Sequence, residues 1–132
     1  MREISILVAE DDPDTLELVK LLLEMEGFSV VGVEDGLAAV ECLSTWRPSV
    51  IVTDLMMPNL SGLELIKWVK GKSGLATIPV VVISAGGKEI LSEAIEAGAI
   101  AVIRKPEKLA QLGDAIREIC SSDRQSPWGL VA

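Results

Sequence analysis

Five short apolar runs, rich in valine and isoleucine, constrain the fold of this chain more than any other feature. They occupy residues 4–9, 30–33, 50–52, 80–83 and 100–103, and they are mostly continuous rather than alternating. Strands of this kind are buried on both faces, which is typical of a parallel sheet covered by helices. Because each gap between runs leaves room for one helix, the spacing predicts a repeated strand–helix unit.

Helix-start signals in the gaps support this prediction. We expect Asp12, which stands before a proline, to cap the first helix, and Asp35 to open the second. Ser61 begins a Ser-x-x-Glu capping box for the third helix. The last two helices are predicted over residues 88–97 and 106–120.

Together these elements predict an α/β fold, a three-layer, flavodoxin-like (βα)5 domain with a doubly wound parallel sheet in strand order 2-1-3-4-5. We expect this domain over residues 1–120, a length common for α/β domains. The polar stretch that begins at Ser121 predicts a C-terminal tail or the start of a linker over residues 121–132.

The composition excludes several kinds of chemistry. The 132 residues include 12 Lys and Arg against 20 Asp and Glu, which gives a net charge of −8, and they include no histidine. Without histidine the chain cannot form a Ser-His-Asp triad, a histidine-ligated zinc site or a phosphohistidine of its own. The acidic balance disfavours binding to a phosphate backbone, so we expect no direct contact with nucleic acid.

Two further sequence features bear on the location of the protein. No apolar run approaches the ~18 residues of a membrane span, and no secretory signal follows the first methionine. We therefore expect a cytoplasmic protein that does not contact a membrane. Cys42 and Cys120 lie far apart in apolar helical patterns, so both are predicted to be buried free thiols.

Polar residues that could carry chemistry follow four of the five predicted strands. Glu10 and Asp11 follow the first strand, Asp54 the third, Ser84 the fourth and Lys105 the fifth. The predicted strand order brings the three carboxylates to one edge of the sheet, where they would repel one another unless a cation neutralised them. A hard divalent ion such as Mg2+ suits oxygen ligands, and Lys105 and Ser84 could then help to hold a phosphoryl group.

These strand-end motifs resemble those of the receiver domains of two-component response regulators. The matching segments are ILVAEDDPD from Ile6, TDLMMP from Thr53 followed by Ser61-Gly62, Ser84-Ala85, and Lys105-Pro106. The resemblance covers residues 3–120. It implies Mg2+-dependent transfer of a phosphoryl group to Asp54 from the phosphohistidine of a histidine kinase or a histidine phosphotransfer protein.

The resemblance also implies the ligands of the metal. Asp11 would bind Mg2+ directly, and Glu10 would bind it through water. Asp54 and the main-chain carbonyl of Met56 would complete the set of protein ligands. Asp12 could be a further ligand, but its place before a proline favours the helix cap.

Four other positions take roles from the same resemblance. Ser84 and Lys105 would bind the phosphoryl oxygens and take part in the switch that follows phosphorylation. Gly62 matches a glycine in the loop after the phosphoacceptor. A cis peptide bond is expected before Pro106.

Two positions depart from the family pattern. Val102 stands where a tyrosine, phenylalanine or histidine normally acts as a switch, and Glu107 stands where a phenylalanine is frequent. A valine cannot swing a ring between two sites, so activation should rely on Ser84 and on residues 85–88. The face formed by the fourth and fifth strands and helices, a possible homodimer surface, is altered by Glu107.

Taken together, the sequence predicts a phosphoacceptor switch that assists its own phosphorylation and dephosphorylation and is not a turnover enzyme. Its downstream effector, and whether it is a single-domain regulator or part of a longer chain, are left open. The departures at Val102 and Glu107 motivate an alternative, a receiver-like interaction module that works without phosphorylation. A phosphatase of the haloacid dehalogenase type is disfavoured because it needs a second aspartate at the position of Met56.

Overall fold

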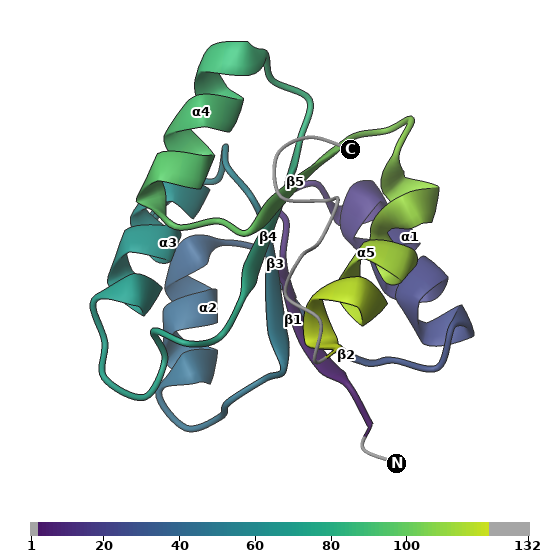
Figure 1. Ribbon diagram of the computed structural model, residues 1–132, viewed down its shortest axis with the longest axis horizontal. Helices are drawn as coiled ribbons and strands as arrows, with labels where there is room; N and C mark the ends of the chain where they lie inside the picture. Colours follow the sequence, from purple (N-terminus) through teal and green to yellow (C-terminus); the bar gives the residue numbers. More distant parts are fainter. Residues whose placement is uncertain (1–2, 122–132) are drawn as a thin grey trace.

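A single five-stranded parallel sheet forms the centre of the protein (Figure 1). The computed structural model describes residues 3–121. The strand order is β2-β1-β3-β4-β5, and every neighbouring pair is parallel. The predicted strand order is therefore confirmed. The strands are β1 (Ser5–Ala9), β2 (Ser29–Val33), β3 (Val50–Asp54), β4 (Val80–Ser84) and β5 (Ala101–Arg104).

Helices cover both faces of the sheet and make the three layers that the sequence predicts. Figure 1 shows α1 and α5 on one face, and α2, α3 and α4 on the other. Each face has its own apolar cluster, one built around Ile6 and Ile116 and the other around Leu7 and Leu65. The helices are α1 (Pro13–Met25), α2 (Gly36–Leu43), α3 (Gly62–Lys70), α4 (Lys88–Ala97) and α5 (Leu112–Cys120), with a short 3-10 helix, η1 (Leu109–Gln111), before α5.

The expected caps begin the first three helices. The Asp12 carboxylate accepts hydrogen bonds from the amide and the hydroxyl of Thr15, at 3.1 and 2.6 Å. Asp35 accepts from the amide of Ala38 at 2.7 Å. Ser61 forms the complete capping box with Glu64. Since these helices are the next elements after the strands β1, β2 and β3, their caps also fix the ends of the loops at the carboxyl edge of the sheet.

Two parts of the fold differ from the prediction. The fifth helix starts at Leu112 rather than at residue 106, and η1 precedes it. Buried residues three apart, such as Leu109 and Leu112, suit a 3-10 turn as well as an α-helix, so their spacing could not separate the two. β2 is an edge strand with partly exposed residues, among them Val31, although its apolar run indicated burial on both faces.

The prediction that both cysteine thiols are buried is wrong. Cys42 is half-buried, and Cys120 is exposed at the end of α5. The helical spacing of apolar residues indicates which face of a helix is buried. It does not indicate whether a cysteine at the border of that face is buried or exposed. In the part of the chain that the structure describes, no helix is long and apolar enough to cross a membrane. Apart from Ser121, the predicted tail lies outside the described residues.

Candidate functional site

Three carboxylates meet at the carboxyl edge of the sheet, where the sequence predicted them. Glu10 and Asp11 follow β1, and Asp54 ends the neighbouring strand β3. Each side chain offers one oxygen, and these three oxygens lie within 4.8 Å of one another. Glu10 and Asp54 are buried, whereas Asp11 is exposed. The cluster therefore opens to solvent on the side of Asp11.

Lys105 reaches into this cluster from the end of β5. Its Nζ donates to Glu10 Oε1 at 2.8 Å and to Asp54 Oδ2 at 3.0 Å. Its backbone amide donates to the Ser84 carbonyl at 3.0 Å, which fixes the chain just beyond β5 against β4. Three carboxylates and one ammonium group leave two negative charges, which is the charge that one divalent cation neutralises.

Burial and charge shift the pKa values inside the cluster. Burial raises the pKa of Glu10 above its ordinary value, and the nearby Asp54 charge adds to the rise, while the bond from Lys105 opposes it. Burial alone would lower the pKa of Lys105, but its bonds to the two carboxylates raise it overall. Lys105 therefore stays charged at neutral pH.

Both oxygens of Asp54 accept hydrogen bonds. Oδ1 accepts from the amide of Leu55 at 2.7 Å and, more weakly, from the amide of Met56 at 3.4 Å. Oδ2 accepts from Lys105. Because the side chain is held by the backbone that follows it, its carboxylate has a fixed orientation toward the edge of the sheet.

The structure also places the remaining predicted residues near this edge. Ser84 is buried at the end of β4, next to β3, and its Oγ accepts from the amide of Gly86 at 3.0 Å. The Lys105–Pro106 peptide bond is cis. A side chain at Gly62 would overlap the backbone of Asp54 and the residue after it, so glycine lets α3 start directly against the end of β3.

Val102 lies within β5. It is fully buried in the apolar cluster on the side of α2, α3 and α4. Its place in β5 therefore contributes to packing, and no aromatic ring stands there to move. Met56 is 71% exposed, so its side chain does not anchor the loop after β3.

Two contacts near the site were missed by the sequence reasoning. The backbone amide of Asp12 donates to Glu10 Oε2 at 3.0 Å, so Glu10 is held on both of its oxygens. The amide group of Asn59 donates to Asp35 Oδ2 at 2.7 Å, across a separation of 24 residues. The Pro58-Asn59 dipeptide is a turn signal, but no local pattern states which side chain such a turn contacts.

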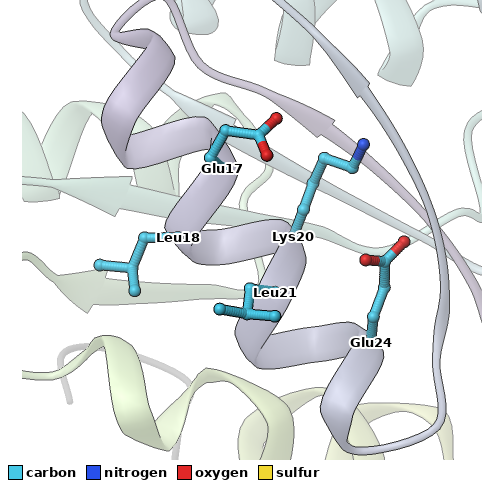
Figure 2. Close-up of a pocket in the computed structure, with 5 residues that line it drawn as sticks. All are labelled: Glu17, Leu18, Lys20, Leu21 and Glu24. Atoms are coloured by element: carbon cyan, nitrogen blue, oxygen red, sulfur yellow. The ribbon is translucent and has the colours of Figure 1, made fainter.

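A second surface feature lies on α1, outside the carboxylate cluster. Figure 2 shows Leu18 and Leu21 on one side of the helix and three charged residues on the other. Leu18, Leu21 and Met25 are 44%, 54% and 74% exposed and form a stripe along α1. A shallow hollow beside this stripe is lined by Glu17, Leu18, Lys20, Leu21 and Glu24.

Comparison with known families now decides the class of the protein. The sequence model of the response regulator receiver domain matches residues 6–117. The chain belongs to this family. Its resemblance to receiver domains, first noted at the strand ends, is thus confirmed over most of the chain. Receiver domains are phosphoacceptor switches of two-component systems, and they act with histidine kinases or phosphotransfer proteins and with downstream effectors.

Individual relatives of this receiver domain occur in different settings. The polar-differentiation response regulator DivK of Brucella anthropi is 31% identical over 114 residues, which are 86% of this chain and 93% of DivK. The transcriptional regulatory protein CseB of Streptomyces coelicolor is 35% identical over 115 residues, but this chain spans only 48% of its length. The signal receiver domain of a histidine kinase from Syntrophus aciditrophicus is 33% identical, with a TM-score of 0.83 and coverage of 92% of this chain and 93% of that domain.

Proposed function

We propose that this receiver domain accepts a phosphoryl group on Asp54 from the phosphohistidine of a partner protein. The observation that carries the proposal is the cluster in which Lys105 contacts both Glu10 and Asp54, with Asp11 at its open side. Such an arrangement supplies a carboxylate oxygen as nucleophile and a fixed positive charge at the same point. Phosphoryl transfer needs little more than this positioning and charge neutralisation.

In the proposed step, a carboxylate oxygen of Asp54 attacks phosphorus. The phosphorus–nitrogen bond of the phosphohistidine breaks, its electron pair stays on the ring nitrogen, and a phosphorus–oxygen bond to Asp54 forms. The amides of Leu55 and Met56 orient the carboxylate through Oδ1. Lys105, which contacts Oδ2 before the reaction, can donate to a phosphoryl oxygen after it. Ser84 lies on the adjacent strand, where its hydroxyl can donate to another.

The residues of the cluster fit Mg2+. Their donors are hard carboxylate oxygens, and one oxygen from each lies within 4.8 Å of the others, which suits a shared cation. Their three negative charges exceed the single positive charge of Lys105 by two. We propose Glu10, Asp11 and Asp54 as the residues that hold it, together with the Met56 main-chain carbonyl. When bound, Mg2+ would offset negative charge on the transferring phosphoryl oxygens.

Phosphorylation from a small donor tests this proposal. Wild-type protein incubated with acetyl phosphate and Mg2+ should gain one phosphoryl group, as measured by intact mass spectrometry. Asp54→Asn should gain none. Asp14→Asn, which removes the charge of an exposed residue in the first turn of α1, should behave as wild type. If the wild-type protein gains neither phosphate nor beryllofluoride, the proposal is wrong.

The exposed apolar stripe on α1 is a suitable docking surface for the protein that donates the phosphoryl group. α1 begins directly after the residues of the carboxylate cluster, so a helical partner seated along the stripe would reach the open side near Asp11. We propose that the exposed Leu18 and Leu21 contact the helices of a histidine kinase or phosphotransfer protein. Leu21→Glu should then slow phosphorylation by that donor severalfold and leave phosphorylation by acetyl phosphate unchanged. Equal rates with the protein donor would exclude this surface.

The wider setting of the domain is part of the same proposal. We propose a receiver domain over residues 1–120 followed by a tail or linker, a cytoplasmic location, and switching through Ser84 and residues 85–88. A homodimer through β4, α4, β5 and α5 is the proposed alternative to action as a monomer. If binding to an effector is identical for wild type and Asp54→Asn, the interaction module that works without phosphorylation is favoured instead.

A further inference from the structure

Hydrogen bonds and packing contacts with several parts of the structure hold the loop between β3 and α3, residues 55–61, in its conformation. At its start, the amides of Leu55 and Met56 donate to Asp54 Oδ1. At its end, the amide of Gly62 donates to the Leu55 carbonyl at 3.0 Å and closes the loop. This loop carries the Met56 carbonyl of the proposed metal site, so its conformation decides where that oxygen stands.

The middle of the loop is held by one aspartate of a different element. Asn59 has a φ of 70°, a left-handed conformation that asparagine tolerates better than most residues. Its Nδ2 donates to Asp35 Oδ2 at 2.7 Å. The other carboxylate oxygen, Asp35 Oδ1, accepts from the amide of Ala38 and caps α2. One carboxylate therefore joins the start of α2 to the loop after β3.

Close packing beside this contact leaves the loop little room. A side chain at Gly36, the residue after Asp35, would overlap the backbone and Cβ of Leu60 in the loop. Leu60 and Met57 pack against the apolar cluster on the same side of the sheet. Met56, by contrast, points its side chain to solvent. Polar and apolar contacts on the α2 side thus fix the loop around Met56, whose own side chain is exposed.

We propose that Asp35 and Asn59 are positioning residues for the phosphoacceptor site, because their hydrogen bond holds the loop that presents the Met56 carbonyl to the cation. The inference rests on the proposed function of that site. Without the bond, the loop must be ordered when the cation binds, and the entropy lost at that moment weakens binding. With the bond, that ordering is already complete in the free protein.

The test is a set of variants that breaks and then restores this one contact. Asn59→Ala removes the donor but leaves the α2 cap intact. Asn59→Asp places two carboxylates face to face, whereas Asp35→Asn can keep a hydrogen bond, because the Asn59 amide can turn so that its Oδ1 accepts from the new asparagine. In the exchange variant Asp35→Asn/Asn59→Asp, the new asparagine can donate to the new aspartate, and the net charge equals that of wild type. Asp114→Asn, in an exposed pair on α5, is the control for loss of one charge.

The dissociation constant for Mg2+, measured by isothermal titration calorimetry, is the main readout. We expect Asn59→Ala to raise it about fivefold, the loss that follows from one hydrogen bond of typical net strength. At saturating Mg2+, the rate of phosphorylation by acetyl phosphate should return to within about twofold of wild type, because the bond acts on the loop and not on phosphorus. The exchange variant should recover wild-type Mg2+ affinity, and Asp114→Asn should keep it.

Several outcomes would overturn the inference. Unchanged Mg2+ affinity in Asn59→Ala, or failure of the exchange variant to bind better than Asn59→Asp, would show that the contact does not position the loop. A purely structural role would lower the urea midpoint without changing the Mg2+ affinity of the folded protein. These outcomes differ from failure of the proposed function, in which wild type itself neither binds Mg2+ nor accepts a phosphoryl group.

Discussion

The two loops that flank Asp54, the proposed phosphoacceptor, are built in opposite ways. The β3–α3 loop is tied to Asp54, to Asp35 and to the capping box that opens α3. The β4–α4 loop, residues 85–87, contains two glycines, and none of the described side chains caps the first turn of α4. The amide of Gly86 donates to Ser84 Oγ, the hydroxyl proposed to change partner on phosphorylation.

Because of this difference, we expect one loop to favour ligand binding and the other to change conformation. The side with the carboxylates is in place before any ligand arrives, which favours binding because little order has to be gained. The side with Ser84 is held by fewer contacts, so the energy of a new hydrogen bond to phosphate can change its conformation. With Val102 buried in place of an aromatic switch, the loop beside Ser84 is where we expect the response to begin.

The largest effect is expected on the fixed side, from Lys105→Met. The substitution leaves the fully buried carboxylate of Glu10 without its positive partner. We expect the free energy of unfolding without Mg2+ to fall by about 3 kcal/mol, as measured by urea denaturation. Mg2+ should stabilise this variant more than wild type, because the cluster then carries three negative charges instead of two.

The control for this prediction is Lys67→Met, which removes an exposed lysine from α3. Its free energy of unfolding, measured by urea denaturation, should stay within about 0.5 kcal/mol of wild type. Equal stability of the two variants would mean that Lys105 does not compensate the buried charge. Phosphorylation by acetyl phosphate should be lost in Lys105→Met only.

A smaller effect comes from the same substitution made where each loop meets the helix that follows it. Gly62→Ala would push a methyl group into the backbone of Asp54 and Leu55, and we expect a loss of about 2 kcal/mol. Gly87→Ala meets nothing within 4 Å and should change stability by less than about 0.5 kcal/mol. Thermal unfolding of the two variants measures the contrast. Similar losses would show that the two loops are equally constrained.

Much of this contrast could be predicted from the sequence, because its signals are local. The Ser-x-x-Glu box predicts the cap of α3, and the adjacent Gly86 and Gly87 predict a loop with few side-chain contacts. The meeting of Glu10 with Asp54 also follows from the strand order, since neighbouring parallel strands end at the same edge. These predictions needed only periodicity and a topological rule.

The remaining features depend on contacts between distant residues. Asp35 was recognised as a helix cap, but a cap uses only one carboxylate oxygen, and the partner of the other lies 24 residues away. The full burial of Glu10 depends on how Lys105 crosses the cluster over a separation of 95 residues. Sequence spacing carries no direct information on such side-chain geometry, which is set by packing of the finished fold.

The third prediction concerns a substitution that should stabilise the β4–α4 loop, which is held by fewer contacts. Gly87→Asp places a carboxylate at the N-cap of α4, where it can accept a backbone hydrogen bond, and it reduces the freedom of the unfolded chain. We expect a gain of about 0.5 to 1 kcal/mol in the free energy of unfolding. NMR spectra with and without beryllofluoride should show smaller changes in residues 85–90 than in wild type. Gly87→Ala, which cannot cap, is the control, and equal spectral changes in both would contradict a role for the open first turn.

The smallest effect concerns the pH dependence of the contact that fixes the other loop. Hydrogen bonds from the amide of Ala38 and from Asn59 hold the pKa of Asp35 below its ordinary value. The unfolded chain therefore binds the proton first, so the stabilisation is complete above the unfolded pKa of about 3.9 and is lost as the pH falls through the lower folded value. In Mg2+-free urea titrations from about pH 5 downward, wild type should lose stability more steeply than Asp35→Asn. Asn59→Ala, which retains only the bond from Ala38, should lie between them, and three parallel curves would mean that neither bond favours the ionised carboxylate.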